Sequence, residues 1–145
     1  MRTMFRVLFF TLVFWSSTGH SQSIFGKWKT IDDRTGNPKA IINIFEKDGL
    51  MYGHIQKILE FGKEDSLCTK CDGEQKNKPI LGMTIIHAAR ETTDGIYKGD
   101  TLFDPEQAMT FRCRIWLNPD NIDELKVRGY LAFIYRTQTW LRVDG

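Results

Sequence analysis

Two cysteines separated by two residues, Cys68 and Cys71, form the pair whose spacing points most directly to chemistry. In an exported protein this spacing is typical of a disulfide that closes a short loop. A zinc site and a reactive redox pair are the alternatives. Zinc needs about four ligands, and the remaining soft candidates, Cys113, His54 and His87, lie on separate expected strands. The sequence therefore predicts a Cys68–Cys71 disulfide, with no metal and no cofactor.

The N-terminal segment indicates whether the protein is exported to an oxidising compartment, in which a disulfide persists. Arg2 and Arg6 are the only charged groups in the first 21 residues, and they flank the start of an apolar run over residues 7–15. A small, polar segment follows over residues 16–21. This pattern is typical of an export signal cleaved before Gln22. It predicts a signal peptide over residues 1–21 and a periplasmic or secreted product.

The remaining chain, residues 22–145, is expected to form a single domain. It carries no cysteine near the expected cleavage point, so lipid attachment there is not available and no membrane anchor is expected after cleavage. Loss of Arg2 and Arg6 leaves 18 basic and 18 acidic residues. A balanced chain with no Lys/Arg block argues against nucleic acid or an anionic membrane as the partner.

Hydrolytic chemistry has little support. After residue 21 only Ser23 and Ser66 are serines, and neither lies in a G-x-S-x-G turn. The pair Asp100 and Asp104 could serve as two carboxylates, but Asp104 precedes a proline and is more typical of a turn cap. Cys113 lies on the apolar side of an alternating segment and is expected to be a buried thiol. These residues favour a binding protein over an enzyme.

Turn residues recur at short intervals and separate runs rich in Ile, Val, Phe, Tyr, Trp and Thr, which is typical of an all-β chain. Residues 109–117 alternate most clearly between apolar and polar side chains. The expected strands cover residues 24–31, 39–46, 50–59, 83–89, 96–103, 109–117, 124–134 and 138–143.

About eight antiparallel strands joined mainly by hairpins can close into an up-and-down barrel, which leaves no exposed edge. A two-sheet β-sandwich is the alternative. The first strand carries Gly26 and Trp28, and the last carries Arg142. If the barrel closes, these strands become neighbours, and Arg142 can stack on Trp28 to seal one end.

This arrangement resembles the calycins, the superfamily of lipocalins and fatty-acid-binding proteins, whose first strand carries G-x-W and whose last strand carries an arginine over that tryptophan. A closer resemblance, to the bacterial family called domain of unknown function 2147, extends over nearly the whole chain after residue 21. It rests on the ordered motifs G-x-W-x-x-x-D-D from Gly26, G-x-x-Y-G from Gly49, C-x-x-C from Cys68, K-P-I-L-G from Lys78, D-P at Asp104, C-x-x-W from Cys113, L-K-V-R-G-Y from Leu125 and R-T-Q-T-W-x-R from Arg136. The resemblance implies a small exported barrel without an assigned activity.

An eight-stranded barrel is either filled by side chains or holds one small ligand. Aromatic residues on the expected strands could line a cavity, with one arginine as a polar anchor. The set predicted for a small apolar or amphipathic ligand comprises Tyr52, Trp116, Arg128, Tyr130 and Trp140. A structural or protein-interaction role in the cell envelope and a thiol- or metal-dependent enzyme are the alternative functions.

Overall fold

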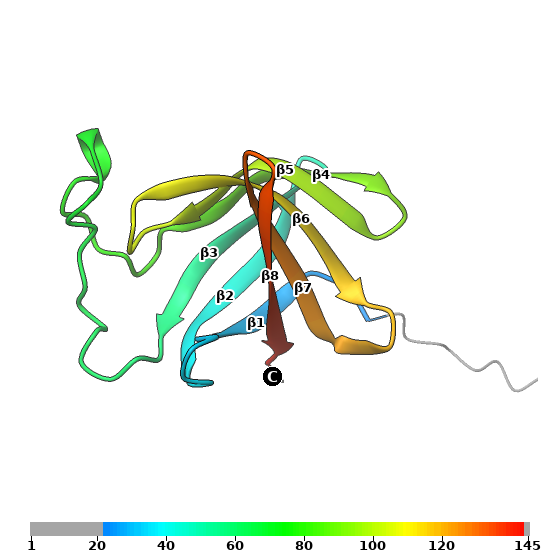
Figure 1. The fold of residues 1–145 in the computed structure, drawn as a ribbon, viewed down its shortest axis with the longest axis horizontal. Coiled ribbons are helices and arrows are strands. Elements are labelled where there is room, and N and C mark those ends of the chain that lie inside the picture. The colour runs from blue at the N-terminus through cyan, green and yellow to red at the C-terminus, as the bar shows by residue number, and fades with distance from the viewer. Residues whose placement is uncertain (1–21, 144–145) are drawn as a thin grey trace, which may run out of the picture.

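The computed structural model describes residues 22–143 and contains a single closed barrel of eight antiparallel strands in sequence order (Figure 1). Each strand pairs with its neighbours in the chain, and the last pairs back with the first. A short 3-10 helix, η1 (Gly73–Gln75), lies in the longest connection. The strands are β1 (Gly26–Ile31), β2 (Pro38–Lys47), β3 (Leu50–Ile58), β4 (Thr84–Thr93), β5 (Ile96–Asp104), β6 (Met109–Asn118), β7 (Asn121–Leu131) and β8 (Ile134–Arg142).

The barrel confirms the expected fold class, and the alternative sandwich is wrong because β8 pairs with β1. The largest difference concerns the last hairpin. The expected strand over residues 124–134 instead ends at Leu131, and the chain reverses at Ala132 and Phe133. Ala132 has a φ of 54° and occupies a position that usually selects glycine or asparagine. Because alanine stands there, no local signal in the sequence indicates this turn.

Antiparallel connectivity divides the loops between two ends of the barrel. The β1–β2, β3–β4, β5–β6 and β7–β8 connections lie at one end, called here the open end. The β2–β3, β4–β5 and β6–β7 turns lie at the other, the closed end, where β1 begins and β8 ends. The β3–β4 connection, residues 59–83, extends furthest from the strands (Figure 1). No helix within residues 22–143 is long and apolar enough to cross a membrane.

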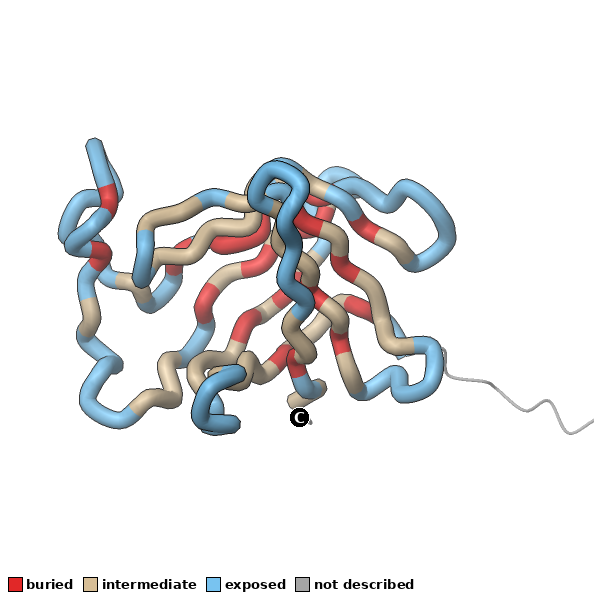
Figure 2. The backbone as a smooth tube through the Cα atoms, viewed as in Figure 1, coloured by how far each residue is buried: buried red, intermediate tan, exposed pale blue. Residues whose placement is uncertain are grey.

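The core fills the closed half of the barrel. Alternate residues of each strand point inward, and Figure 2 shows the buried positions along the strands with exposed loops around them. The packed side chains of this half come from seven strands, β1 to β7, and include Trp28, Ile44, Met51, Ala89, Tyr97, Ile115 and Leu125, all buried. Phe25 packs edge-on against Tyr97, with ring centroids 5.9 Å apart. Further buried apolar residues of the same cluster, including Ile42, Ile85 and Val127, continue toward the open end.

Two interior glycines meet different surroundings. A Cβ on Gly99 would lie 3.2 Å from the Cα and the Cβ of Ala89, and 3.5 Å from the Cys113 sulfur. A Cβ on Gly129 would meet Leu102 and Phe111 only at ordinary contact distances, 3.6 Å or more. The first glycine lets β4, β5 and β6 approach each other closely, whereas the second borders free space.

Gly99→Ala should therefore lower the free energy of unfolding by about 1–3 kcal/mol, the usual cost of overpacking a core. Gly129→Ala is the matched control and should change stability by less than about 1 kcal/mol, because it clashes with nothing and reduces the entropy of the unfolded chain. Urea unfolding of both variants measures the difference. Equal stability of the two variants would contradict the close packing around Gly99.

Candidate functional site

The open half of the barrel contains a cavity of about 770 Å³. Inward-facing apolar residues of β2 to β8 form its walls, and Trp140 lies among them with its ring buried. The indole Nε1 of Trp140 donates a hydrogen bond to Oε1 of Gln138, 3.0 Å away, so this buried polar group is satisfied within the wall. The apolar lining residues inside the strands include Ile42, Ile55, Ile85, Leu102, Phe111 and Val127.

Ion pairs surround the mouth of the cavity and connect neighbouring loops. Lys39 Nζ lies 2.9 Å from Glu106 Oε2 and 3.9 Å from Glu60 Oε1, linking β2 to the β5–β6 and β3–β4 connections. Glu60 also pairs with Lys63 at 2.9 Å. On the other side, the Arg136 guanidinium of β8 pairs with Asp33 in the β1–β2 connection. The cavity is thus apolar inside and charged at its entrance.

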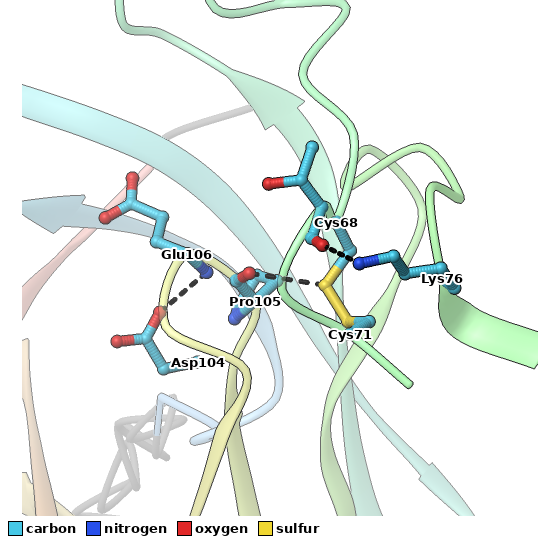
Figure 3. The surroundings of a disulfide bond; sticks show 7 residues. Cys68, Cys71, Lys76, Asp104, Pro105 and Glu106 are labelled. Atoms are coloured by element: carbon cyan, nitrogen blue, oxygen red, sulfur yellow. Dashed lines mark hydrogen bonds between the residues drawn. A yellow bond between two sulfur atoms is a disulfide. The ribbon is translucent and has the colours of Figure 1, made fainter. Parts of the chain in front are cut away.

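A disulfide fixes the long β3–β4 connection beside this entrance. Cys68 and Cys71 are bonded, as the sequence predicted, and both are buried. The Cys68 sulfur lies 3.3 Å from the carbonyl oxygen of Pro105, in the β5–β6 turn that lines the cavity (Figure 3). In the same turn, the Glu106 amide donates to Oδ1 of Asp104 at 2.9 Å. The disulfide therefore lies against the β5–β6 turn, whose residues line the cavity.

Only one of the five residues predicted for ligand binding lines the cavity. Trp140 does, whereas Tyr52, Trp116, Arg128 and Tyr130 lie on the outer wall. Tyr52 stacks on Phe45 and meets His87 edge-on, with centroids 5.8 and 5.2 Å apart. The other three take part in a cluster on β6, β7 and β8. The predicted set is corrected on this point: strand alternation turns these four side chains away from the interior.

The sequence interpretation missed the residues that form the cavity. Ile42, Val127 and Gln138 share one side of their strands with residues that fill the closed half, so periodicity marks them only as interior. Gly129 borders the cavity because it has no side chain to fill the space. The useful signal was the K-V-R-G-Y segment, in which a glycine stands at an inward position of β7.

The other candidate groups remain apart. Cys113 is buried between β5 and β7, and burial raises the pKa of its thiol to about 11, which disfavours the reactive thiolate. His54 and His87 contact aromatic rings on the outer wall. Within residues 22–143, no three His, Cys, Asp or Glu side chains lie close enough together to hold a metal ion.

At the closed end, Arg142 lies over Trp28, its Cζ 4.3 Å from the ring centroid. Its guanidinium also donates to the carbonyl oxygens of Ser23 and Ile122, at 3.1 and 2.9 Å, and to Asp123 at 3.2 Å. The Trp28 indole in turn donates to the carbonyl oxygen of residue 24 at 2.9 Å. Gly26 begins β1 with a φ of 132°, which lets the chain turn into the strand over this cap.

A closed eight-stranded barrel, packed at one end and hollow at the other, is the architecture of lipocalin-like proteins. A structural comparison agrees: the fold is similar to that of "Protein HP1028 from the human pathogen Helicobacter pylori belongs to the lipocalin family", with a TM-score of 0.70, 16% identity and 84% of each chain covered. A family model described as "Uncharacterized protein conserved in bacteria (DUF2147)" matches residues 26–142. The chain belongs to this DUF2147 family. No curated protein matches the sequence.

Arg142→Met should lower the free energy of unfolding by about 3 kcal/mol, because it removes a partly desolvated cation–π contact and several charge-assisted hydrogen bonds. Arg142→Lys keeps the charge but cannot form the same set of hydrogen bonds, so its loss should be smaller. Thermal unfolding followed by circular dichroism compares the two. If the methionine variant is as stable as the parent protein, this cap does not stabilise the barrel.

Proposed function

We propose that the protein is a binding barrel that holds one small apolar or amphipathic molecule in the cavity of its open half. The observation that carries this proposal is the 770 Å³ cavity, a size typical of small-molecule sites, with apolar walls and charged groups at its mouth. An apolar chain or ring would displace water from the walls. A polar end group would remain at the entrance beside Lys39, Lys63 or Arg136.

Gly129 provides the sharpest test, because a side chain added there projects toward the cavity without a close contact. Gly129→Leu should weaken binding of the fluorescent probe N-phenyl-1-naphthylamine at least about tenfold, since the leucine occupies ligand volume and one tenfold step equals about 1.4 kcal/mol. Displacement of the probe by a long-chain fatty acid should be lost in parallel. Fluorescence titration measures both effects.

Tyr52→Leu is the matched control, because it removes an aromatic ring from the outer wall and should leave probe binding unchanged. Native mass spectrometry of the purified parent protein then asks whether a small molecule copurifies with it. If Gly129→Leu binds the probe as tightly as the parent, or if the outer-wall variant loses binding equally, the cavity is not the site.

We further propose that the protein acts outside the cytoplasm, after cleavage of residues 1–21. These residues lie outside the described part of the structure, and support comes from the arginine-flanked apolar run and small residues before Gln22. A disulfide in residues 68–71 also fits an oxidising compartment.

Expression of the full sequence in a bacterial host tests export. The intact mass of the protein in the periplasmic or culture fraction should correspond to a chain beginning at or within about two residues of Gln22. It should also be lighter by two hydrogens than the fully reduced chain. Full-length protein confined to the cytoplasm would contradict export.

A further inference from the structure

The β7–β8 hairpin ends in apolar residues that the barrel does not cover. The hairpin tip, defined as Leu131, Phe133 and Ile134, is 51%, 91% and 65% exposed. Figure 2 shows this turn and the first half of β8 as exposed. A turn of this kind usually carries glycine or asparagine, yet here a non-glycine residue adopts a positive φ at Ala132 and a phenylalanine follows it. The conformation of the turn therefore gives no reason for apolar residues at its tip.

Aromatic and cationic side chains lie directly behind the tip on the outer wall. Tyr130 and Tyr135 are paired across the hairpin, with ring centroids 5.9 Å apart. The Arg112 guanidinium lies 5.7 Å from the Tyr130 ring centroid and donates to the carbonyl oxygen of Ala132 at 3.0 Å. Arg112 is thus held against the base of the turn.

A second row follows further from the tip. The Arg128 guanidinium carbon lies 4.3 Å from the Tyr135 ring centroid and 5.2 Å from that of Trp116, and Arg128 Nε donates to Thr137 at 2.8 Å. The Arg114 guanidinium carbon also lies over the Trp116 ring, 4.9 Å from its centroid. Stacking holds these guanidiniums on the wall, which leaves their charge available to an anionic partner. The docking face is defined as Arg112, Arg114, Trp116, Arg128, Tyr130 and Tyr135.

The charges of this face are not neutralised within the described chain. Lys98, Arg114 and Arg128 stand opposite one another on β5, β6 and β7, an arrangement of like charges that disfavours strand pairing. Within residues 22–143, no carboxylate oxygen lies within 4.0 Å of the charged nitrogens of these three residues or of Arg112. Arg114 Nε is buried without a hydrogen-bond partner. An external anion would offset the repulsion between these like charges.

The order of the groups identifies the partner. The Leu131–Ile134 pair is three residues from the Arg128–Thr137 pair, about 10 Å along the strands at 3.3 Å per residue. The apolar tip is therefore followed by the two tyrosines with Arg112 beside them, and then by Arg128 and Arg114, over the depth at which peripheral proteins enter a bilayer surface. Nucleic acid would use the cations and aromatic rings but give the apolar tip no contact.

We propose that the β7–β8 hairpin docks the protein on a lipid bilayer containing anionic headgroups, with the tip among the acyl chains and the docking face among the phosphates. The hairpin turn belongs to the open end, and Arg136 of β8 lines the cavity mouth. Docking would therefore bring that mouth near the membrane. This last point rests on the proposed ligand-binding function, whereas the docking itself does not.

Vesicle sedimentation tests the docking, with phosphatidylglycerol–phosphatidylcholine vesicles compared with vesicles of phosphatidylcholine alone. The parent protein should prefer the anionic vesicles and lose that preference as salt is raised. Phe133→Ser combined with Ile134→Ser should weaken binding at least about tenfold, because each apolar side chain loses its burial. Arg112→Gln and Arg128→Gln should each weaken it about fivefold, while the corresponding lysine variants should retain most of it.

Matched controls lie on the rest of the barrel. Ile122→Ser removes an exposed apolar residue at the closed end, and Lys47→Gln removes a cation near the β2–β3 turn. Both should bind vesicles as the parent does. Every variant carries the same N-terminal segment, so the contribution of that segment cancels in the comparison. Thermal unfolding verifies that each variant is folded.

A local readout completes the test. Measured as the difference from the parent protein, the tryptophan emission added by Phe133→Trp should shift to the blue on anionic vesicles and be quenched by brominated acyl chains, whereas that added by Ile122→Trp should not. Gly129→Leu should still dock, which separates failure of ligand binding from failure of docking. Absence of vesicle binding, or an equal loss of binding in the control variants, would overturn the proposal. If the parent does not bind vesicles, an acidic protein becomes the alternative partner of the docking face.

Discussion

The barrel depends on a short seam between its first and last strands. Only two residue pairs connect β1 to β8, Trp28 with Arg142 and Lys29 with Leu141, and the amide of Val143 extends the seam by one hydrogen bond to Lys27. The stacking of Arg142 on Trp28 reinforces this junction with side chains. Without closure, Trp140 and Trp28 would lie on the open edges of a sheet, and no enclosed interior would exist. The cavity is therefore a consequence of closure at the opposite end.

The parts of the fold that the sequence predicted are those encoded by local signals. Asp48 and Gly49 encode a tight hairpin, the alternation over residues 109–117 encodes β6, and Gly26, Trp28 and Arg142 indicate a closing barrel. The last hairpin could not be predicted in this way, because its turn is set by the pairing of β7 with β8. Ala132 adopts a positive φ there because eight paired positions hold the two strands in register.

The sequence predicted that the candidate site would be a cavity inside a barrel, but it did not predict which residues line that cavity. Alternation separates the two faces of a strand but does not tell which interior positions meet side chains and which meet space. That depends on the sum of volumes from all eight strands, as the contrast between Gly99 and Gly129 shows. The sequence interpretation instead favoured large aromatic residues, and Trp116 and Tyr130 proved to pack against arginines outside. Aromatic residues of the strands therefore lie on the outer wall as well as in the interior of the barrel.

Net charge likewise does not describe where the charged groups lie. A count of 18 cations against 18 anions after residue 21 describes the chain as neutral, but folding separates the signs. At the mouth, acids and bases meet in pairs such as Lys39 with Glu106. On β5, β6 and β7, Lys98, Arg114 and Arg128 stand opposite one another, and both arginines stack on Trp116. Because both regions meet at the β7–β8 hairpin, a neutral protein can present one strongly basic wall beside the entrance of an apolar cavity. If the proposed docking and ligand binding both hold, a molecule that moves between a bilayer and that cavity would meet both surfaces, and the uneven charge distribution and the hollow end would serve the same transfer.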